Sequence, residues 1–442
     1  MKRMSSFVGA LAVSLGLALC LVPSATAQEQ QPQKAQKPGY TMPEYNAYQA
    51  CVADQNAQTK VKCLDDFAAK YPNSELLPYA YREYYRAYAQ LRDYPKMATY
   101  ADKMLALGDK IDMATRLEAA QVRAQAFYLG QNLLAFQTPE QLQAARTAAK
   151  DGLALLEKFQ KPEQVSAEDF DKQKKGVTIL FYSVEGIAAM MAKDTKAAIE
   201  AFENLHKLDP KEATNVYRLG RAYLSLDPPQ YMDGFWHLAK AIDLKVQGGQ
   251  QIRAYLRSQV QRYQGVVCDS VIDREMNELL DMATKSEDRP ASYTIPSSAD
   301  LQRIREETTT TFINELKAGG DRAKLVFMAY CGLEFPEVSG KVISVEASDG
   351  PITVKLFLGA TPEETEAGTV ANMDIQVVDQ PEAKRLATVK DWALRFSGTL
   401  SGYDPEPFML HWTKCKINPE DIPEEPAPGK AAKRPPKRPP RP

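Results

Sequence analysis

The sequence of 442 residues contains little of the chemistry that enzymes and metal sites use. It has three histidines, His206, His237 and His411, and they lie far apart in the chain. No H-x-x-x-H, H-E-x-x-H or C-x-x-C pattern occurs, so a zinc or dithiol site has no ligand motif. The G-x-S-x-G motif, the P-loop and the glycine-rich dinucleotide motif are missing as well. These absences predict a protein that is not an enzyme and uses no metal or other cofactor.

The chain also lacks a dominant charge. Its formal net charge is −2, and charged residues make up 25% of the sequence. Proteins that bind the phosphate backbone of nucleic acids need a strongly basic face. The balance of charges therefore predicts that nucleic acid is not a partner.

Long apolar runs are scarce, and the clearest one lies at the start of the chain. Residues 7–22 are apolar, follow Lys2 and Arg3, and precede the small-residue site at 25–27. This order is typical of a secretory signal peptide, so residues 1–27 are predicted to be removed by cleavage after Ala27. The run is shorter than the roughly 20 residues that a membrane span needs. We expect a periplasmic or secreted protein that is not an integral membrane protein.

A lipoprotein signal is an alternative to this soluble export. Cys20 could serve as its lipid-bearing cysteine, but the bulky Leu19 stands where such signals have a small residue. The sequence leaves lipoprotein and soluble export open.

Five cysteines remain after cleavage, and an exported chain can keep disulfides. Cys51 and Cys63 face each other across a predicted helix–turn–helix, and packed helices 8–10 Å apart can bring two inward side chains together. A disulfide between them is predicted, with two buried thiols as the alternative. A bond between Cys331 and Cys415, which bracket the C-terminal strands, is favoured less strongly and would leave Cys268 unpaired.

Helical patterning predicts an all-α domain over residues 43–285, after a polar lead-in at 28–42 that is expected to be disordered. Within it, Gly186 and Gly220 stand 34 residues apart at equivalent places in a helix pair. Small residues at Gly186 and Ala198 let two helices cross closely, and Phe202 fills the space beside them. Pro210 ends the second helix, because proline disfavours helix in the residue before it.

This period and these offsets resemble the tetratricopeptide repeat, a helix pair that is stable only when it stacks on copies of itself. The residues after position 67 also look like the helix ends of periplasmic repeat proteins of the Gram-negative envelope. The resemblance implies a superhelical solenoid that binds other chains. The positions to which it assigns structural roles in the repeat are Tyr88, Gly186, Ala198, Phe202, Pro210, Gly220 and Tyr223.

The resemblance also implies which residues line the concave groove. The second, fifth and ninth positions of each first helix face it, which gives Arg82 and Arg86 in one unit and Tyr217 and Arg221 in another. Guanidinium groups hold carboxylates in a two-pronged manner, so the groove is expected to receive acidic or C-terminal peptide segments. A solvated basic face is the alternative interpretation.

The C-terminal part is predicted to be a β domain. Residues 286–298 are rich in serine and proline and are predicted to be a linker, with connecting helices over 299–334. Alternating apolar residues over 335–418 predict five strands with a short helix between the third and fourth. This order resembles the oligonucleotide/oligosaccharide-binding (OB) barrel. The predicted fold class is a multidomain α + β chain, with a helical solenoid followed by a small five-stranded barrel.

The chain closes with a proline-rich basic segment at 419–442, which is expected to be a disordered tail. We expect it either to contact an anionic polymer of the envelope or to act only as a solubilising tail. Its basic residues are Lys430, Lys433, Arg434, Lys437, Arg438 and Arg441.

The sequence as a whole predicts a non-catalytic exported scaffold that binds a protein or peptide partner in the groove of its helical repeats. The alternative is a protein that binds cell wall or glycan through the β domain, since a barrel fold by itself does not specify a ligand.

Overall fold

The structure is a computed structural model that describes residues 39–265, 268–308, 311–346, 351–359, 361–389 and 391–424. The predicted signal peptide, residues 28–38 of the lead-in and residues 425–442 of the tail lie outside these ranges. The chain divides into two compact units, residues 1–249 and 250–442, which are described separately. This boundary falls inside the helical region at 43–285, so the last two helices of that region group with the C-terminal unit.

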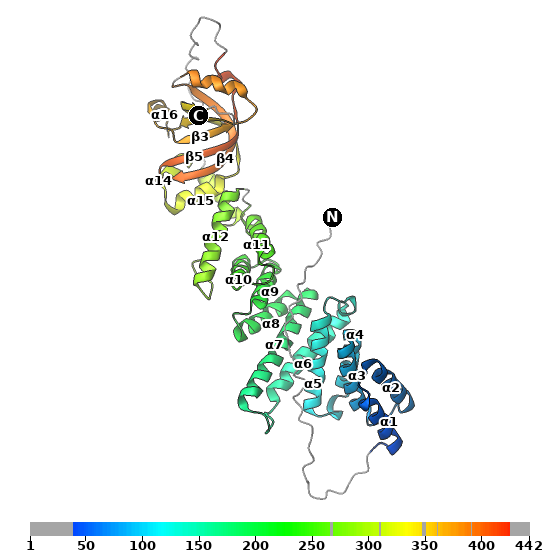
Figure 1. The fold of residues 1–442 in the computed structure, drawn as a ribbon. Coiled ribbons are helices and arrows are strands. Elements are labelled where there is room, and N and C mark those ends of the chain that lie inside the picture. Colours follow the sequence, from blue (N-terminus) through cyan, green and yellow to red (C-terminus); the bar gives the residue numbers. More distant parts are fainter. Residues whose placement is uncertain are drawn as a thin grey trace. The chain divides into compact units, whose positions relative to one another are not determined.

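The first unit is a stack of ten α-helices within residues 39–249 (Figure 1). Each helix packs mainly against its neighbours in sequence, which is the arrangement of a helical solenoid and confirms the predicted fold class. Two short 3₁₀ helices, η1 (Gly108–Lys110) and η2 (Leu134–Phe136), lie in its turns. The α-helices are α1 (Met42–Ala53), α2 (Ala57–Lys70), α3 (Leu77–Leu91), α4 (Tyr94–Leu105), α5 (Met113–Gly130), α6 (Pro139–Lys158), α7 (Ala167–Met191), α8 (Thr195–Leu208), α9 (Ala213–Leu224) and α10 (Tyr231–Asp243).

One tight turn occurs twice in this stack. Arg92 after α3 and Lys193 after α7 both adopt the left-handed conformation, with φ of 56° and 62°. Each is followed by an aspartate, Asp93 or Asp194, whose side chain caps the next helix by accepting a backbone N–H bond. Two helix pairs are thus joined by the same local chemistry.

The glycines 34 residues apart lie at close helix contacts. A Cβ at Gly186 would be 2.3 Å from the ring of Phe202, and one at Gly220 would be 3.0 Å from the backbone nitrogen of Leu238 on α10. Ala198 and Phe202 are fully buried beside Gly186. Both glycines therefore sit where a side chain would separate two packed helices.

The other positions with expected roles in the repeat also lie in the stack. Tyr88 is buried, and Tyr223 donates a hydrogen bond from Oη to Glu203 Oε1 at 2.6 Å. Pro210 follows the end of α8 at Leu208. Tyr84 stacks on Tyr100 with ring centroids 3.9 Å apart.

The predicted disulfide between Cys51 and Cys63 is confirmed. It joins α1 to α2 with their Cα atoms 5.3 Å apart. The two helices form a short hairpin whose turn is capped by Asn56, which accepts hydrogen bonds from the N–H groups of Gln58 and Thr59.

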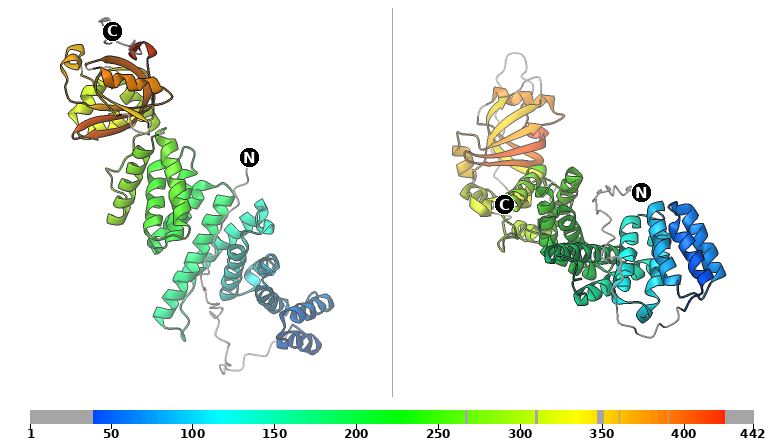
Figure 2. Two further views of the ribbon diagram at one scale, coloured as in Figure 1. Left: turned by 45° about the horizontal axis from the view of Figure 1, so that its top comes forward. Right: turned by 60° about the horizontal axis from the view of Figure 1, so that its bottom comes forward.

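The second unit consists of helices and a closed five-stranded barrel, seen in further views in Figure 2. The strand order is β1-β2-β3-β5-β4, and β4 pairs with β1 to close the barrel. β3 and β5 are parallel, and the other pairs are antiparallel. The strands are β1 (Glu334–Glu346), β2 (Ile352–Phe357), β3 (Met373–Val377), β4 (Ala393–Pro405) and β5 (Phe408–Ile417).

The predicted short helix between the third and fourth strands is present as the 3₁₀ helix η3 (Pro381–Thr388). A further helix, α16 (Pro362–Ala367), lies between β2 and β3, where the sequence predicted a connection without a helix. The remaining helices are α11 (Gly249–Gln264), α12 (Asp269–Lys285), α13 (Ser298–Thr308), α14 (Phe312–Ala318), α15 (Gly320–Tyr330) and the 3₁₀ helix η4 (Pro419–Asp421). Along the described ranges, none of the helices combines the length and the apolar character that crossing a bilayer demands.

Two segments that were predicted to be loose connections pack instead on the second unit. Tyr293 and Ile295, in the proposed linker, are only 6% and 3% exposed. The start of the proposed tail forms η4, where the backbone carbonyl of Asp421 accepts a hydrogen bond from Trp392 Nε1 at 2.6 Å. The proline and serine content of these segments led to the prediction of loose connections, although each segment also contains apolar residues that pack on the unit.

The weaker disulfide prediction is wrong. Cys331 bonds to Cys268, and Cys415 remains a buried free thiol. The alternation of β5 turns Cys415 into the barrel, where Gly398 leaves room for its sulfur, while Cys331 ends α15 beside the start of α12. Burial raises the pKa of the Cys415 thiol to about 12, which makes this cysteine unreactive at neutral pH.

Candidate functional site

The predicted groove residues Arg82 and Arg86 already hold carboxylates of their own chain. Arg82 Nη2 lies 2.7 Å from Glu118 Oε2, and Arg86 lies 3.3 Å from Glu83 and 3.6 Å from Glu118. Glu118 Oε1 also accepts a hydrogen bond from Tyr85 Oη at 2.8 Å. Glu118 belongs to α5, so this cluster fastens α3 to α5. Its positive charge is largely compensated, which favours a structural role for Arg82.

The other predicted pair, Tyr217 and Arg221, lies one helical turn apart on α9. Arg221 Nη1 donates a hydrogen bond to Tyr217 Oη at 3.0 Å, and the guanidinium lies 6.0 Å from the centre of the tyrosine ring. Arg221 is exposed, and Tyr217 is half-buried. This pair presents a cation and an aromatic edge on the surface of the stack. The two predicted pairs lie on different helices, and each has its own contacts.

The barrel carries a polar cluster that sequence reasoning missed. His411 Nδ1 lies 2.7 Å from Asp374 Oδ2, and His411 Nε2 lies 2.9 Å from Asp404 Oδ2. The three side chains come from β5, β3 and β4 and hold these strands together on the outer face. Burial opposes the charged ring, but the hydrogen bonds and charges of Asp404 and Asp374 outweigh it and raise the pKa of His411. Alternation marked Asp374 and His411 as outward residues, but only the strand register makes them neighbours.

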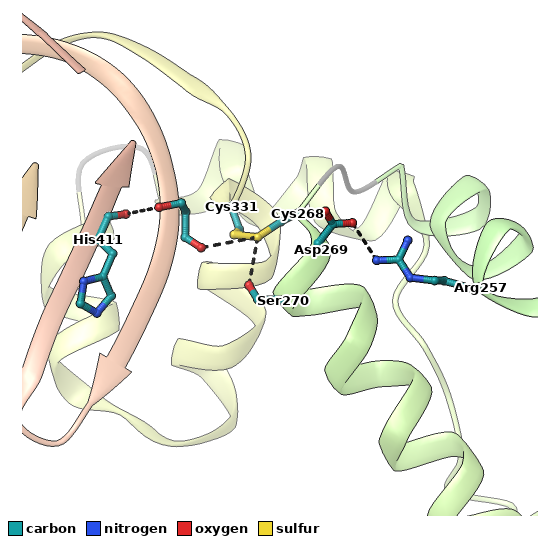
Figure 3. The surroundings of a disulfide bond; sticks show 7 residues. Arg257, Cys268, Asp269, Ser270, Cys331 and His411 are labelled. Atoms are coloured by element: carbon teal, nitrogen blue, oxygen red, sulfur yellow. Dashed lines mark hydrogen bonds and ion pairs between the residues drawn. A yellow bond between two sulfur atoms is a disulfide. The ribbon is translucent and has the colours of Figure 1, made fainter. Parts of the chain in front are cut away.

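The disulfide Cys268–Cys331 lies close to this part of the barrel (Figure 3). The sulfur of Cys268 is 3.3 Å from Ser270 Oγ and 3.9 Å from the carbonyl oxygen of Ser401, and Ser401 Oγ donates to the carbonyl of His411 at 3.1 Å. The start of α12 is thereby joined covalently to the end of α15 and by polar contacts to β4.

A cavity of about 330 Å³ opens between the helices of the second unit and the start of β1. Phe312, Tyr330 and Phe335 form its aromatic wall, with ring centroids 4.6 to 5.9 Å apart. Arg305 and Glu306 of α13 complete the lining. Arg305 Nη1 donates to the carbonyl of Ala329, and Tyr330 Oη donates to the carbonyl of Arg305. The cavity thus offers flat apolar surface with charged groups at its side.

Within the part of the chain that the structure describes, no three histidine, cysteine, aspartate or glutamate side chains gather to hold a metal ion. No known protein-family model matches the chain, and no curated protein matches its sequence. Its own residues and their geometry therefore have to indicate its function.

The histidines give a direct check on the electrostatics of both units. Burial is the main cause that lowers the pKa of His237 on α10, whereas the two aspartates raise that of His411. We expect an NMR titration to place the pKa of His411 above and that of His237 below the ordinary value of about 6.5. Because the folded pKa of His411 is raised, its contribution to barrel stability is present below about pH 6.5 and is lost as the pH rises through the folded pKa. Asp404→Asn should lower the pKa of His411 and leave the pKa of His237 unchanged. A pKa of His411 below 6.5 would contradict a charged cluster of His411 with the two aspartates.

Proposed function

We propose that this chain is an exported, non-catalytic scaffold whose helical unit binds a segment of another protein. The observation that supports the proposal most is the stack of helices, each packed on its neighbours in sequence. Such stacks form extended surfaces that bind other chains. The recurring turn at Arg92-Asp93 and Lys193-Asp194 and the contact of Gly186 with Phe202 favour tetratricopeptide-type helix pairs.

The proposed location is the periplasm or the exterior of a Gram-negative cell. Its two disulfides suit an oxidising compartment. Residues 1–27 have the order of a signal peptide with cleavage after Ala27. The basic residues beyond 425 would then meet an anionic envelope polymer as a further partner.

Arg221 is a more informative position than Arg82 for testing the proposed groove. Arg82→Glu would place a carboxylate against Glu118 and disturb the packing of α3 on α5, so lost binding would be ambiguous. Arg221 is exposed and donates a hydrogen bond to Tyr217 on its own helix, so its charge reversal does not touch the ion pair between α3 and α5. Lys207 on α8 is also exposed and gives a matched charge reversal.

We expect Arg221→Glu combined with Tyr217→Ala to weaken partner binding at least tenfold, because a cation and an aromatic contact are both lost. Partners are first identified by crosslinking in the native envelope, and their affinity for purified mature protein is then measured by titration. Lys207→Glu should bind as the wild type does. Equal binding by the wild type, the double variant and Lys207→Glu would show that α9 does not belong to the binding surface.

A second function, glycan or cell-wall binding by the barrel, is favoured by one observation. Lys355, Asp374 and His411 follow one another across β2, β3 and β5 as outward polar residues. Such a row can hydrogen-bond to sugar hydroxyls. Retention of the whole mature chain on insoluble peptidoglycan, lost with His411→Ala, would support this function, and no retention would exclude it. The whole chain is the right sample, because Cys268 and residues 419–424 belong to the same unit as the barrel.

A further inference from the structure

The aromatic cavity has the surface chemistry that recognises proline-rich chains. Proline-rich segments adopt a preformed extended helix and dock on aromatic grooves, where proline rings pack flat against side-chain rings. Phe312, Tyr330 and Phe335 supply one continuous aromatic wall, and all three are half-buried. Phe335 leans in turn on the buried Trp412, with centroids 5.0 Å apart, so the wall is supported by the barrel core.

The same chain contains a segment with matching chemistry. Residues 425–442 contain seven prolines and the tandem sequence Lys-Arg-Pro-Pro at 433–436 and 437–440. We propose that this C-terminal segment docks on the aromatic cavity of its own chain, with its prolines on the rings and its basic residues toward nearby carboxylates.

The charges around the cavity complement those of the segment. Glu306 lines the cavity, and Glu334 and Glu337 are exposed on β1 beside Phe335. The segment has six basic residues and one acidic residue, Glu425. The cation of the cavity, Arg305, is held to the carbonyl of Ala329 at 2.9 Å. Together, Glu306, Glu334 and Glu337 outnumber Arg305, so these positions carry a net negative charge, and its attraction for the basic segment adds to the packing of prolines on rings.

The segment starts close enough to reach the cavity. The last described residues pack on β4 through Arg395, whose Nε lies 2.9 Å from Asp421 Oδ2. Phe335 pairs with Gly398 of the same strand, three residues further along, or roughly 10 Å at the rise of a β-strand. A proline-rich chain extends about 3.1 Å per residue, so even a few residues cover that distance.

Tethering makes even weak docking effective. A segment joined to its site by a short chain has an effective concentration in the millimolar range. A free-peptide dissociation constant of about 100 μM would therefore leave the cavity mostly occupied by its own segment. If the proposed function holds, an anionic envelope polymer that binds the basic residues of the segment would compete with this docking.

The test uses a fluorescent peptide of residues 425–442 and two mature chains. One is the wild type, and the other has Pro435, Pro436, Pro439 and Pro440 replaced by alanine, which keeps every charge. Anisotropy titrations should show at least tenfold tighter peptide binding to the alanine-tail chain, because its own segment no longer fills the cavity. In the alanine-tail chain, Phe312→Leu should weaken the binding of the peptide at least fivefold. Tyr79→Ala, which removes an exposed ring of the helical unit, should have no effect on this binding.

A second peptide, with its prolines replaced by alanine, separates stacking from charge. It should bind at least fivefold more weakly than the natural peptide to the alanine-tail chain, and this comparison needs no cavity variant. Equal binding of the two peptides, or equal binding to the two chains, would overturn the proposal. Failure to bind below about 1 mM would overturn it too, including the case in which the peptide binds only to anionic vesicles.

Discussion

Replacing Phe202 with alanine should lower the free energy of unfolding of the helical unit by about 3–5 kcal/mol, the usual loss for a fully buried phenylalanine. Phe202 is 1% exposed and fills the space against Gly186. Its removal therefore leaves a cavity between α7 and α8. Urea unfolding of the mature protein followed by circular dichroism measures the loss.

The contact between Gly186 and Phe202 predicts that the effect of Gly186→Ala on stability reverses its sign when Phe202 is also replaced by alanine. Gly186→Ala alone should destabilise by about 1–3 kcal/mol, because its Cβ would lie 2.3 Å from the Phe202 ring. With Phe202→Ala already present, the same methyl group enters the cavity and gains helix propensity, so it should stabilise. If Gly186→Ala destabilises equally in both backgrounds, the two residues do not share this space.

Gly176 on the same helix is the matched control. A Cβ there meets nothing within 4 Å, and the residue is exposed. Gly176→Ala should therefore stabilise by up to about 1 kcal/mol in either background, because alanine favours helix over glycine. This isolates the steric part of the Gly186 effect from helix propensity.

Sequence reasoning succeeded where one helix pair contains both partners. Gly186 and Phe202 are joined by a single turn, and Cys51 and Cys63 by the hairpin of α1 and α2. Helical periodicity fixes which side chains face inward across such a short connection. The barrel followed for a similar reason, because alternation marks each strand even when its partner is unknown.

It failed where partners come from distant segments. The charge of Arg82 was visible in the sequence, but Glu118, which neutralises it, lies on a later helix pair. Likewise, His411 meets Asp374 only through the parallel pairing of β3 and β5. Such contacts depend on register and packing angle, which composition and period do not encode. The register of the repeat therefore assigned Arg82 to a ligand-binding groove, whereas in the structure it forms an ion pair with Glu118.

The disulfide Cys268–Cys331 is the clearest of these long-range contacts, and its loss should destabilise the second unit strongly. It closes a loop with a sequence separation of 63, for which chain entropy gives about 4 kcal/mol. The separation of Cys51 and Cys63 is 12, which gives about 3 kcal/mol. We expect Cys268→Ala with Cys331→Ala to lower the stability of the second unit by up to about 4 kcal/mol and to leave the helical unit almost unchanged.

Tryptophan fluorescence can follow this unit, because Trp392 and Trp412 are buried in it whereas Trp236 belongs to α10. Cys415→Ala is the matched control: it also removes a buried sulfur but closes no loop, so only the packing loss of one small side chain is expected. The double variant should therefore unfold at clearly lower urea than the control. Before that comparison, a thiol assay on unreduced mature chain in denaturant should find one thiol, that of Cys415. A tryptic fragment that links Cys331 to Cys415, or equal unfolding midpoints for the double variant and the control, would show that α12 is not tied to the end of α15.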